Sequence, residues 1–383
     1  METRLANTKD LESLRSCDPV VLCASDDNYV KSLTVTLHSA AQHLNGECQI
    51  HAIVFDGGIS ESNWQKIKES LAGLPIQLHA IRPDLNQVQD LSISHHITHT
   101  AYLRLLAGRL LPESIDRAIY FDSDLLIQDD ISKLWQIDLG DNYALAVPDI
   151  ACPYIDARHS VCNFKKASPY LSALSPVANW SELKLDPQGY YFNSGMMVLN
   201  IQRMREEAVE HQLLQCLREN KKHVWCWDQY ALNVVFAGAW KPLPLHWNVG
   251  AHFFEFPDET YSPFHTDEFL HAIEQPSIIH YTTEWKPWDY ANRHPLRDRF
   301  FDQLDQTAFA GWRPTRPEFN FRKSWDAFWA EAIKQFYIRY QSCAAGLRKT
   351  PDLTAAQLPR MNSPVTNSDQ SRAANESAVA GTS

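Results

Sequence analysis

The sequence has no C-x-x-C pair, no long apolar run and no excess of positive charge. Its eight cysteines are too scattered for a zinc or dithiol motif, so we expect reduced thiols and a cytoplasmic protein. No apolar run reaches the length of a membrane span, and residues 1–18 lack the apolar core of a secretory signal. Lys and Arg number 35 against 46 Asp and Glu, a net charge of −11, which argues against nucleic acid as a partner.

What the chain does contain is a regular alternation of short apolar runs with segments of helical spacing. At 383 residues it is long enough to bury a large core. The alternation predicts an α/β fold with a mostly parallel sheet flanked by helices. The expected strands are 19–25, 49–55, 76–81, 118–121, 143–147, 190–199 and 276–281. The expected helices are 29–44, one beginning at Ser60, 101–111, 201–218 and 227–236.

Composition divides the chain into four parts. We expect an N-terminal extension (1–18), one large domain (19–312) and a helical segment with an aromatic face and basic flanks (313–349). The last part, 350–383, has almost no large apolar residues and is predicted to be disordered. Within the large domain, 150–188 is rich in Pro, Ser and Asn and weakly periodic, as in a loop-rich insert.

The stretch Asp122-Ser123-Asp124 lies between two apolar runs. Carboxylates beside a buried strand are costly unless something pairs with them, and two hard oxygen donors one residue apart can share a divalent cation. Such a cation would neutralise a diphosphate, so the motif predicts a nucleotide-activated substrate with Ser123 among its contacts. The alternative is a solvated turn after a strand.

A second polar group, Asp26-Asp27-Asn28-Tyr29, follows the first expected strand. In open α/β sheets ligands bind outside the carboxyl ends of strands. A carboxylate and an amide suit a uracil or ribose edge, and Tyr29 suits stacking on the base, although a helix N-cap is an alternative for Asp27 or Asn28. No glycine-rich loop follows this strand, whereas a sugar nucleotidyltransferase would need one to approach a triphosphate.

Further candidate residues lie later in the chain. Arg104 suits bracing of a carboxylate or phosphate, with a surface arginine as the alternative. Asn193-Ser194-Gly195 interrupts an apolar strand and suits either a wall that hydrogen-bonds a sugar or a bulge. Asp228 and Gln229 follow two tryptophans, as in a carbohydrate subsite, although Asp228 also suits a helix N-cap.

His280 lies at the end of an expected strand, as the Asp122-Ser123-Asp124 motif does. It therefore suits the third ligand of the metal site, with a structural histidine as the alternative. Two carboxylates and one imidazole favour Mn²⁺ over Mg²⁺, because nitrogen is a softer ligand. Lys286 suits a phosphate as a point charge.

Taken in this order, the motifs resemble glycosyltransferase family 8 from about residue 20 to 288. The resemblance implies a GT-A fold, with a Rossmann-like sheet and a smaller acceptor region. It also implies a UDP-hexose donor (UDP-galactose or UDP-glucose), a glycan or glycolipid acceptor and retention of the anomeric configuration. Mn²⁺, or Mg²⁺ in its place, would be held by Asp122, Asp124 and His280. The uridine would be met by Asp26, Asn28 and Tyr29, the sugar by Arg104, Asn193, Asp228 and Gln229, and the diphosphate by Lys286.

The sequence also departs from the family and leaves rivals open. Bacterial members usually carry a glycine shortly after the metal histidine, where this chain has Thr283. Bacterial relatives often dock on membrane through a C-terminal basic and aromatic segment, and 322–349 looks similar. The alternative is a helix packed on its own domain. The rival functions are a glycogenin-like self-glucosylating protein and a non-catalytic sugar-binding protein on the same scaffold.

Overall fold

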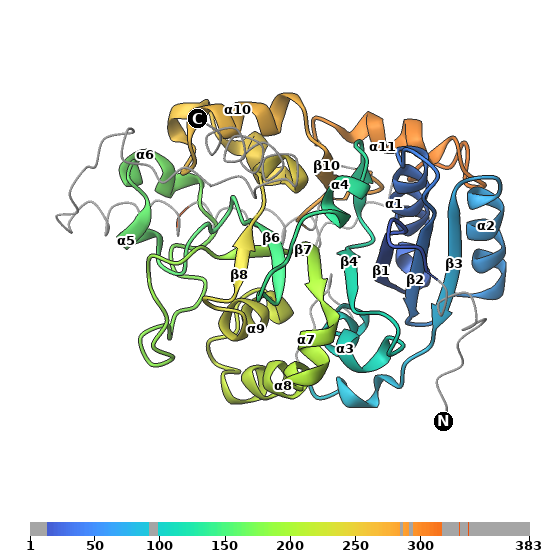
Figure 1. Ribbon diagram of the computed structural model, residues 1–383. Helices are drawn as coiled ribbons and strands as arrows, with labels where there is room; N and C mark the ends of the chain where they lie inside the picture. Colours follow the sequence, from blue (N-terminus) through green and yellow to red (C-terminus); the bar gives the residue numbers. More distant parts are fainter. Residues whose placement is uncertain are drawn as a thin grey trace, which may run out of the picture.

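The computed structural model describes residues 14–91, 99–283, 286–290 and 294–315, together with the single positions 329 and 336. Its larger sheet has seven strands in the order β3-β2-β1-β4-β7-β6-β8, which run from right to left in Figure 1. These strands are β1 (Val20–Ser25), β2 (Ile50–Asp56), β3 (Ile76–Ile81), β4 (Arg117–Phe121), β6 (Ala144–Pro148), β7 (Phe192–Asn200) and β8 (Trp240–Pro242). All neighbouring pairs are parallel except the two that β7 forms with β4 and β6.

The central position of β1 explains how the polar motifs are brought together. β1 pairs in parallel with β2 on one side and β4 on the other, with Val21 opposite Ile119. The carboxyl ends of parallel neighbours meet at one edge. The segments that follow β1 and β4, which begin with Asp26 and Asp122, therefore emerge side by side.

A smaller sheet of three strands completes this edge. It has the order β5-β10-β9, with β5 (Leu125–Ile127), β9 (Val249–Gly250) and β10 (Ile278–His280). β5 and β10 are antiparallel, and their register places His280 opposite Leu125. This pairing brings the end of β10 next to Asp124, although the two residues are far apart in the sequence.

Helices cover both faces of the large sheet (Figure 1). They are α1 (Val30–Gln42), α2 (Glu61–Leu71), α3 (Ala107–Leu110), α4 (Ser132–Trp135), α5 (Ala157–Ser160), α6 (Phe164–Ala167), α7 (Ile201–Glu206), α8 (Val209–Glu219), α9 (Trp227–Val235), α10 (Thr266–Glu274) and α11 (Arg297–Leu304). Side chains alternate between the two faces along each strand. Val21 and Cys23 pack in a core with α1, α2 and α11, whereas Val20 and Leu22 pack in a second core with α3 and α7–α9.

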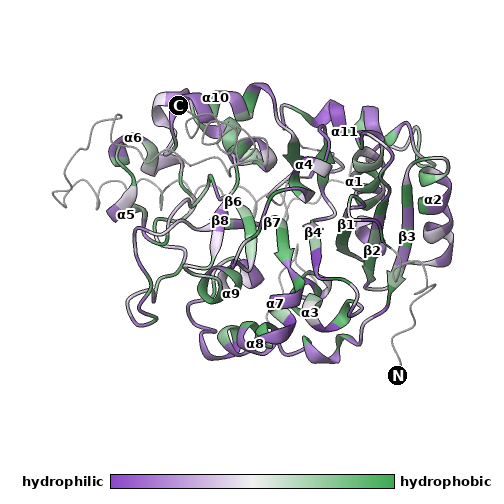
Figure 2. Cartoon of the chain, in the orientation of Figure 1, coloured by the Kyte–Doolittle hydropathy of each residue, from purple (hydrophilic) through white to green (hydrophobic). Residues whose placement is uncertain are grey.

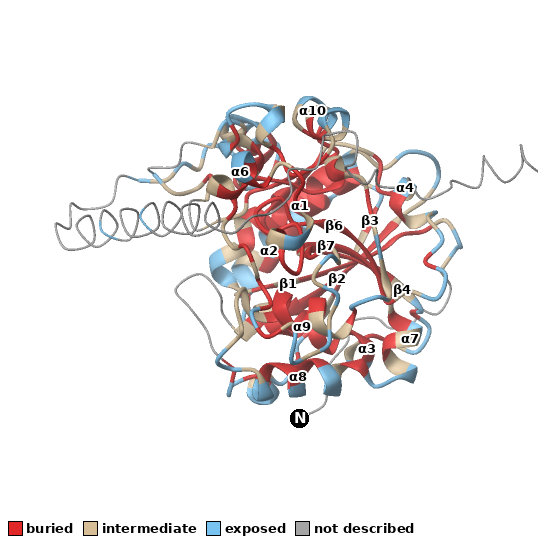
Figure 3. Cartoon of the chain, turned by 90° about the vertical axis from the view of Figure 1, so that its left-hand side faces the viewer, coloured by how far each residue is buried: buried red, intermediate tan, exposed pale blue. Residues whose placement is uncertain are grey.

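The hydropathy pattern explains this layering. The inner strands are apolar while the helices carry polar outer faces (Figure 2). The inner strands and the inner helix faces are buried (Figure 3), whereas the edge strands β3 and β8 are only partly buried. A sheet buried on both faces needs apolar residues at nearly every position, and β2 is buried along its whole length. The expected α/β fold with a mostly parallel sheet is confirmed.

Several expected boundaries are wrong. The helix expected at 101–111 is a 3-10 helix, His99–Leu106, followed by the short α3. The helix expected at 201–218 is two helices, α7 and α8, because Ala208 adopts a left-handed φ of 48° between them. The segment 150–188 contains the two four-residue helices α5 and α6 and is otherwise mostly irregular, so its description as a loop-rich insert is not contradicted.

Other expectations fall outside the described residues. These are the helix at 322–349, the disordered tail at 350–383 and most of the N-terminal extension. The proposed domain limits stay predictions. Among the helices within the described ranges, none combines the length and the apolar character that a membrane crossing requires.

Candidate functional site

Two carboxylates and one imidazole meet where the two sheets adjoin. Asp122 directly follows β4, Asp124 directly precedes β5, and His280 is the last residue of β10. One ligand atom from each lies within 4.8 Å of the other two. His280 Nε2 is 3.3 Å from Asp124 Oδ1 and 3.8 Å from Asp122 Oδ2. This mixed oxygen and nitrogen set suits a divalent cation.

Gly195 on β7 leaves room for this set. The Asp122 N–H donates to the Gly195 carbonyl at 2.8 Å, so backbone and ligands are packed closely. A Cβ added to Gly195 would overlap His280 Cε1 and would lie 2.8 Å from Asp122 Oδ2. Any larger residue would therefore displace two of the three candidate ligands.

The surroundings of Asp124 give the strongest indication of a metal site. Lys286 Nζ lies 2.5 Å from Asp124 Oδ2. Burial works to raise the pKa of the Asp124 carboxyl, but the neighbouring Lys286, with His280, holds that pKa below its ordinary value. The other oxygen, Oδ1, is buried and receives no hydrogen bond from any described residue. A buried anionic oxygen without a donor is costly, so the residues present fit a bound metal ion.

A buried guanidinium separates Asp122 from a third carboxylate. Arg104 Nη2 lies 2.7 Å from Asp122 Oδ1, and Arg104 Nε lies 3.1 Å from Asp228 Oδ2. The guanidinium stacks 4.5 Å from the centre of the Tyr120 ring, and the Tyr120 hydroxyl donates to Asp122 Oδ1 at 2.9 Å. Burial works to lower the pKa of Arg104, but the two carboxylates hold it above its ordinary value. The surface alternative for Arg104 is therefore wrong, and the residue braces carboxylates.

Asp228 lies in the first turn of α9. The chain reaches this turn through Cys226 and Trp227, whose φ angles of 58° and 48° are both left-handed. Burial raises the pKa of the Asp228 carboxyl to about 6, although Arg104 opposes this. The N-cap alternative for Asp228 is wrong, because Cys226 occupies that position.

A series of amide hydrogen bonds fixes the proton of His280. Asp149 Oδ2 accepts from Asn193 Nδ2 at 3.1 Å and from Gln229 Nε2 at 2.9 Å. Because a carboxylate only accepts, the Asn193 NH₂ group must face Asp149. The Asn193 oxygen therefore faces away from Asp149, and it accepts from Asn248 Nδ2 at 3.0 Å. Asn248 Oδ1 then faces His280 Nδ1 at 2.9 Å. Nδ1 therefore donates to Asn248, and Nε2 is the nitrogen that faces the two aspartates.

Ser194 links the arginine and the glutamine. Its N–H donates to Gln229 Oε1 at 3.0 Å, and its carbonyl accepts from Arg104 Nη1 at 2.9 Å. Both ends of the Gln229 side chain are thus held within the protein. The Asn193-Ser194-Gly195 interruption of β7 serves as the framework of the site, and a register shift where β7 meets β6 accompanies it.

Two neighbouring cavities open at this edge of the sheet. The larger has a volume of about 460 Å³, and we call it the charged cavity. Its lining includes Asp26, Tyr29, Arg104, Asp122, Ser123, Asp124, His280 and Lys286. The smaller, of about 250 Å³, is the amide cavity, and its lining includes Asp149, Asn193, Trp225, Gln229 and Asn248. Both are lined by Ser172, Trp227, His252, Thr282 and Thr283.

The polar loop after β1 is divided between the charged cavity and α2. Asp26 and Tyr29 line the cavity, and the Asp26 carboxylate accepts from the Asn28 N–H at 3.0 Å. Asp27 instead accepts from the Ser60 N–H at 2.8 Å and from the Asn63 amide. The Ser60 N–H at the start of α2 has no intrahelical partner, and together with the Asn63 side chain it holds Asp27 there. Neither Asp27 nor Asn28 is among the residues that line the charged cavity.

Thr283 lies on the rim shared by both cavities. Its φ of 75° is left-handed, a conformation that is unusual for a β-branched residue. The family resemblance led us to expect a glycine near this position. A left-handed φ is readily adopted by glycine, and threonine holds it under strain.

Two residues of the site were missed in the sequence analysis. Asp149 follows β6 in the same way that Asp122 follows β4, so the rule of strand carboxyl ends would have identified it. Asn248 directly precedes the two-residue strand β9. A strand this short leaves no periodicity in the sequence, and nothing in the pattern indicates Asn248.

Comparisons with known proteins agree with this geometry. The family model "Glycosyl transferase family 8" matches residues 20–292. General stress protein A of Bacillus subtilis is 27% identical over 293 residues, 76% of this chain and 94% of that protein. The lipopolysaccharide 1,2-glucosyltransferase of Escherichia coli is 27% identical over 291 residues, 74% of this chain and 75% of that protein.

A solved structure also shares the fold. The galactosyltransferase LgtC, in complex with donor and acceptor sugar analogues, superposes with a TM-score of 0.60 at 23% identity. The match covers 78% of this chain and 98% of that chain. The family resemblance and the GT-A fold expected from the sequence are confirmed.

Proposed function

The chain belongs to glycosyltransferase family 8, and on this premise we propose that it transfers galactose or glucose from a UDP-sugar to a glycan or glycolipid acceptor. The transfer retains the anomeric configuration and uses Mn²⁺, or Mg²⁺ in its place. The observation that carries the proposal is the convergence of Asp122, Asp124 and His280 within 4.8 Å, with the buried Asp124 Oδ1 lacking a donor among the described residues.

The charged cavity is the proposed donor site. Asp122, Asp124 and His280 would hold the metal, which when bound supplies positive charge to a leaving diphosphate. Lys286 supplies a further cation from the same side. Asp26 and Tyr29 would contact the nucleoside, and their presence in the lining of the same cavity as the metal ligands supports this role.

The meeting of the two cavities is the proposed place of sugar transfer. Arg104 Nε forms an ion pair with Asp228 Oδ2 at 3.1 Å while its N–H donates to the Ala101 carbonyl, and Asp149 and Ser194 fix both ends of Gln229. An ion pair with a buried guanidinium neutralises Asp228, which supports a positioning role for this carboxylate over that of a free nucleophile. We therefore propose attack by the acceptor on the face that UDP leaves, with Asp228 and Gln229 positioning the sugar.

The amide cavity is the proposed acceptor site. Its lining combines amides, one carboxylate and the Trp225 ring, and sugars are bound by such hydrogen-bonding groups together with aromatic faces. The acceptor hydroxyl would reach the donor sugar across the rim that the two cavities share. The predicted membrane contact through 322–349 stays a prediction.

A panel of UDP-sugars tests the proposal. We expect Mn²⁺-dependent hydrolysis of UDP-galactose or UDP-glucose without acceptor, and loss of that activity in Asp124→Ala. Asp90→Ala is the matched control, since Asp90 forms an exposed ion pair with Arg218. No hydrolysis of any UDP-sugar by the unmodified chain, with or without glycan acceptors, would contradict the proposal. A glycosyl adduct trapped on Asp228 would replace front-face attack by a covalent route.

A further inference from the structure

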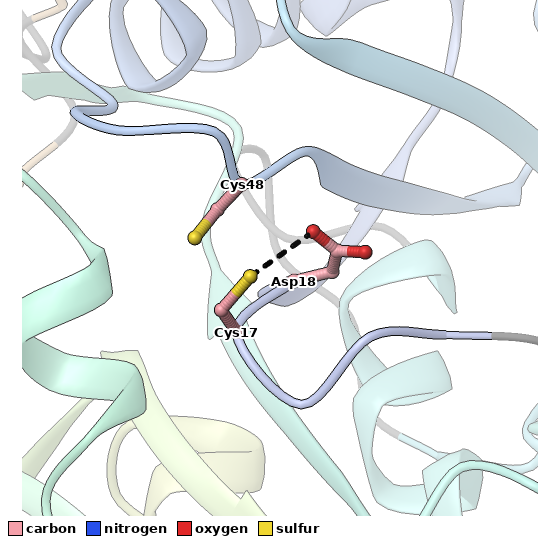
Figure 4. Close-up of side chains that lie close together, drawn as sticks. All are labelled: Cys17, Asp18 and Cys48. Atoms are coloured by element: carbon pink, nitrogen blue, oxygen red, sulfur yellow. Dashed lines mark hydrogen bonds between the residues drawn. The ribbon is translucent and has the colours of Figure 1, made fainter.

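A second cluster of metal-ligating side chains lies at the opposite edge of the large sheet. Cys17 and Asp18 precede β1, and Cys48 precedes β2. One ligand atom from each lies within 4.8 Å of the other two. Figure 4 shows the two sulfur atoms facing one another, with the Asp18 carboxylate beside Cys17. β1 spans about 20 Å, so this cluster is remote from both cavities.

The pairing of β1 with β2 explains why the two cysteines meet. Their register sets Val20 opposite His51, and the same register continued three residues back sets Cys17 opposite Cys48. The His51 N–H donates to the Pro19 carbonyl at 2.9 Å, so the pairing continues before the strands begin. The two thiols are therefore brought together by the sheet itself.

Arg15 and Asp18 hold the two segments rigidly. Asp18 Oδ1 accepts from the Gln49 N–H at 2.8 Å, which ties the segment of Cys17 to that of Cys48. Arg15 donates to both oxygens of Asp18, through Nη2 at 2.8 Å and Nε at 2.9 Å, and also to the Glu47 carbonyl at 2.6 Å. The ligand atoms are thus positioned before any ion arrives.

The two thiols form a short series of weak hydrogen bonds. The Cys17 thiol donates to Asp18 Oδ1 at 3.7 Å. A hydrogen bond with Cys17 raises the pKa of the Cys48 thiol to about 11, and burial adds to the rise. Cys17 and Cys48 are half-buried, so the sulfurs remain open to solvent on one side.

We propose that Cys17, Asp18 and Cys48 form a binding site for a thiophilic divalent cation of the Zn²⁺ class, separate from the metal of the charged cavity. Thiolates select soft or borderline cations, whereas Mn²⁺ and Mg²⁺ prefer oxygen. Zinc with two thiolates and one carboxylate keeps a fourth position for water, which the half-exposed cysteines allow.

The binding reaction balances without any oxidant. The two thiols lose their protons to solvent as the cation enters, two sulfur–metal bonds form, and no electron is transferred. The bound cation ties the two turns before β1 and β2 together and stabilises the folded chain by mass action. This inference goes beyond the proposed function, because neither cysteine contacts the cavities.

Titration of the full chain with Cd²⁺ tests the site. Cadmium has the same ligand preferences, and its bonds to thiolate absorb in the ultraviolet. With a non-thiol reductant present, we expect one equivalent to bind with a thiolate–cadmium band and release of about two protons in calorimetry. Zn²⁺ should compete with Cd²⁺, and Mn²⁺ should not.

Cys17→Ser/Cys48→Ser is the test variant and Cys162→Ser the control, since Cys162 lies outside the cluster. We expect the band and the Cd²⁺-induced rise in Tm to disappear in the double variant and to persist in the control. Donor hydrolysis should be unchanged in both, which separates this result from the fate of the proposed function. An equal band in the double variant, or binding by the unmodified chain without proton release, would overturn the proposal. If the double variant does not fold, the single variant Cys48→Ser serves instead, and we expect it to bind Cd²⁺ more weakly than the unmodified chain.

Discussion

The charged cavity and the amide cavity share part of their lining, yet the carboxylates that line them have different partners. In the charged cavity, carboxylates lie against Arg104, Lys286 and His280. In the amide cavity, Asp149 is met by neutral amides from Asn193 and Gln229. Charge against charge suits a diphosphate and its metal, whereas neutral amides suit a sugar with hydroxyl groups. The difference supports the proposal that the leaving group is bound in the charged cavity and the acceptor in the amide cavity.

The largest expected effect comes from removing the cation that separates the carboxylates. In Arg104→Ala, the buried Asp228 and the half-buried Asp122 would both lose their guanidinium partner. We expect the free energy of unfolding to fall by about 3–5 kcal/mol, measured by urea denaturation. Arg218→Ala is the control, because its ion pair with Asp90 is exposed on both sides and such a pair contributes about 0–1 kcal/mol. Similar losses of unfolding free energy in the two variants would contradict the special role of the buried guanidinium in the charged cavity.

The amide series from Asp149 to His280 gives the next largest effect. Asn248→Ala removes the acceptor that fixes the proton on His280 Nδ1. We expect metal affinity to fall by about 10–100-fold, measured by Mn²⁺ titration with UDP present. Asn142→Ala, which removes a donor to the Leu139 carbonyl, is the control. Unchanged metal affinity in Asn248→Ala would show that the hydrogen bonds of the amide cavity do not orient His280 for metal binding.

The pKa of Asp228 predicts how the site responds to pH. Burial raises that pKa to about 6 from an ordinary 3.8, so ionisation of Asp228 destabilises the folded state. Its contribution to stability therefore falls as pH rises through 6 and recovers as pH falls. Activity should respond in the opposite way, because the proposed role needs the carboxylate.

We expect kcat/KM for donor hydrolysis to fall about tenfold per pH unit below 6. Asp228→Asn should lose most activity, and what remains should not show this acid limb. An acid limb near pH 6 that persists in Asp228→Asn would assign the titration to another group and contradict the role given to Asp228.

A smaller and more selective effect is expected at Trp225, which lines the amide cavity alone. Trp225→Ala should raise the KM for the acceptor through loss of stacking worth about 1 kcal/mol. Donor hydrolysis without acceptor should stay as in the unmodified chain. Measured side by side, the two activities separate the cavities. An equal loss of acceptor transfer and donor hydrolysis would contradict the assignment of the two cavities to separate substrates.

The smallest expected effect is at the shared rim. Thr283→Gly relieves a left-handed φ of 75°, and strain of this kind costs of order 1–3 kcal/mol. Glycine adds unfolded-state entropy worth about 0.5–1 kcal/mol. We therefore expect a net gain of about 1 kcal/mol in thermal unfolding. A loss of stability would show that contacts of the threonine side chain outweigh the strain.

The sequence predicted those parts of the site that follow strand ends. Asp122, Asp124 and His280 were found because carboxyl ends of strands meet at one edge, and Asp149 obeys the same rule. Asp27 also follows a strand, yet its carboxylate accepts hydrogen bonds from the Ser60 N–H and the Asn63 side-chain amide at the start of α2. Spacing alone does not show which of two neighbouring carboxylates turns to a helix.

Other features depend on contacts between distant segments. The burial of Arg104 requires Asp122 and Asp228 to converge from different elements, and Asn248 acts through a two-residue strand. The left-handed Ala208 that divides α7 from α8 is likewise invisible in apolar spacing. The periodicity of the chain thus predicts the layers of the fold, whereas side-chain partners across those layers need the structure.

The central claim is that Asp122, Asp124 and His280 form a metal site that binds a nucleoside diphosphate. Calorimetric titration of UDP into the protein, with and without Mn²⁺, tests it most directly. The account predicts binding that requires Mn²⁺ in the unmodified chain and is absent in Asp124→Ala. Equal binding of UDP with and without the metal, or no binding in either case, would contradict it.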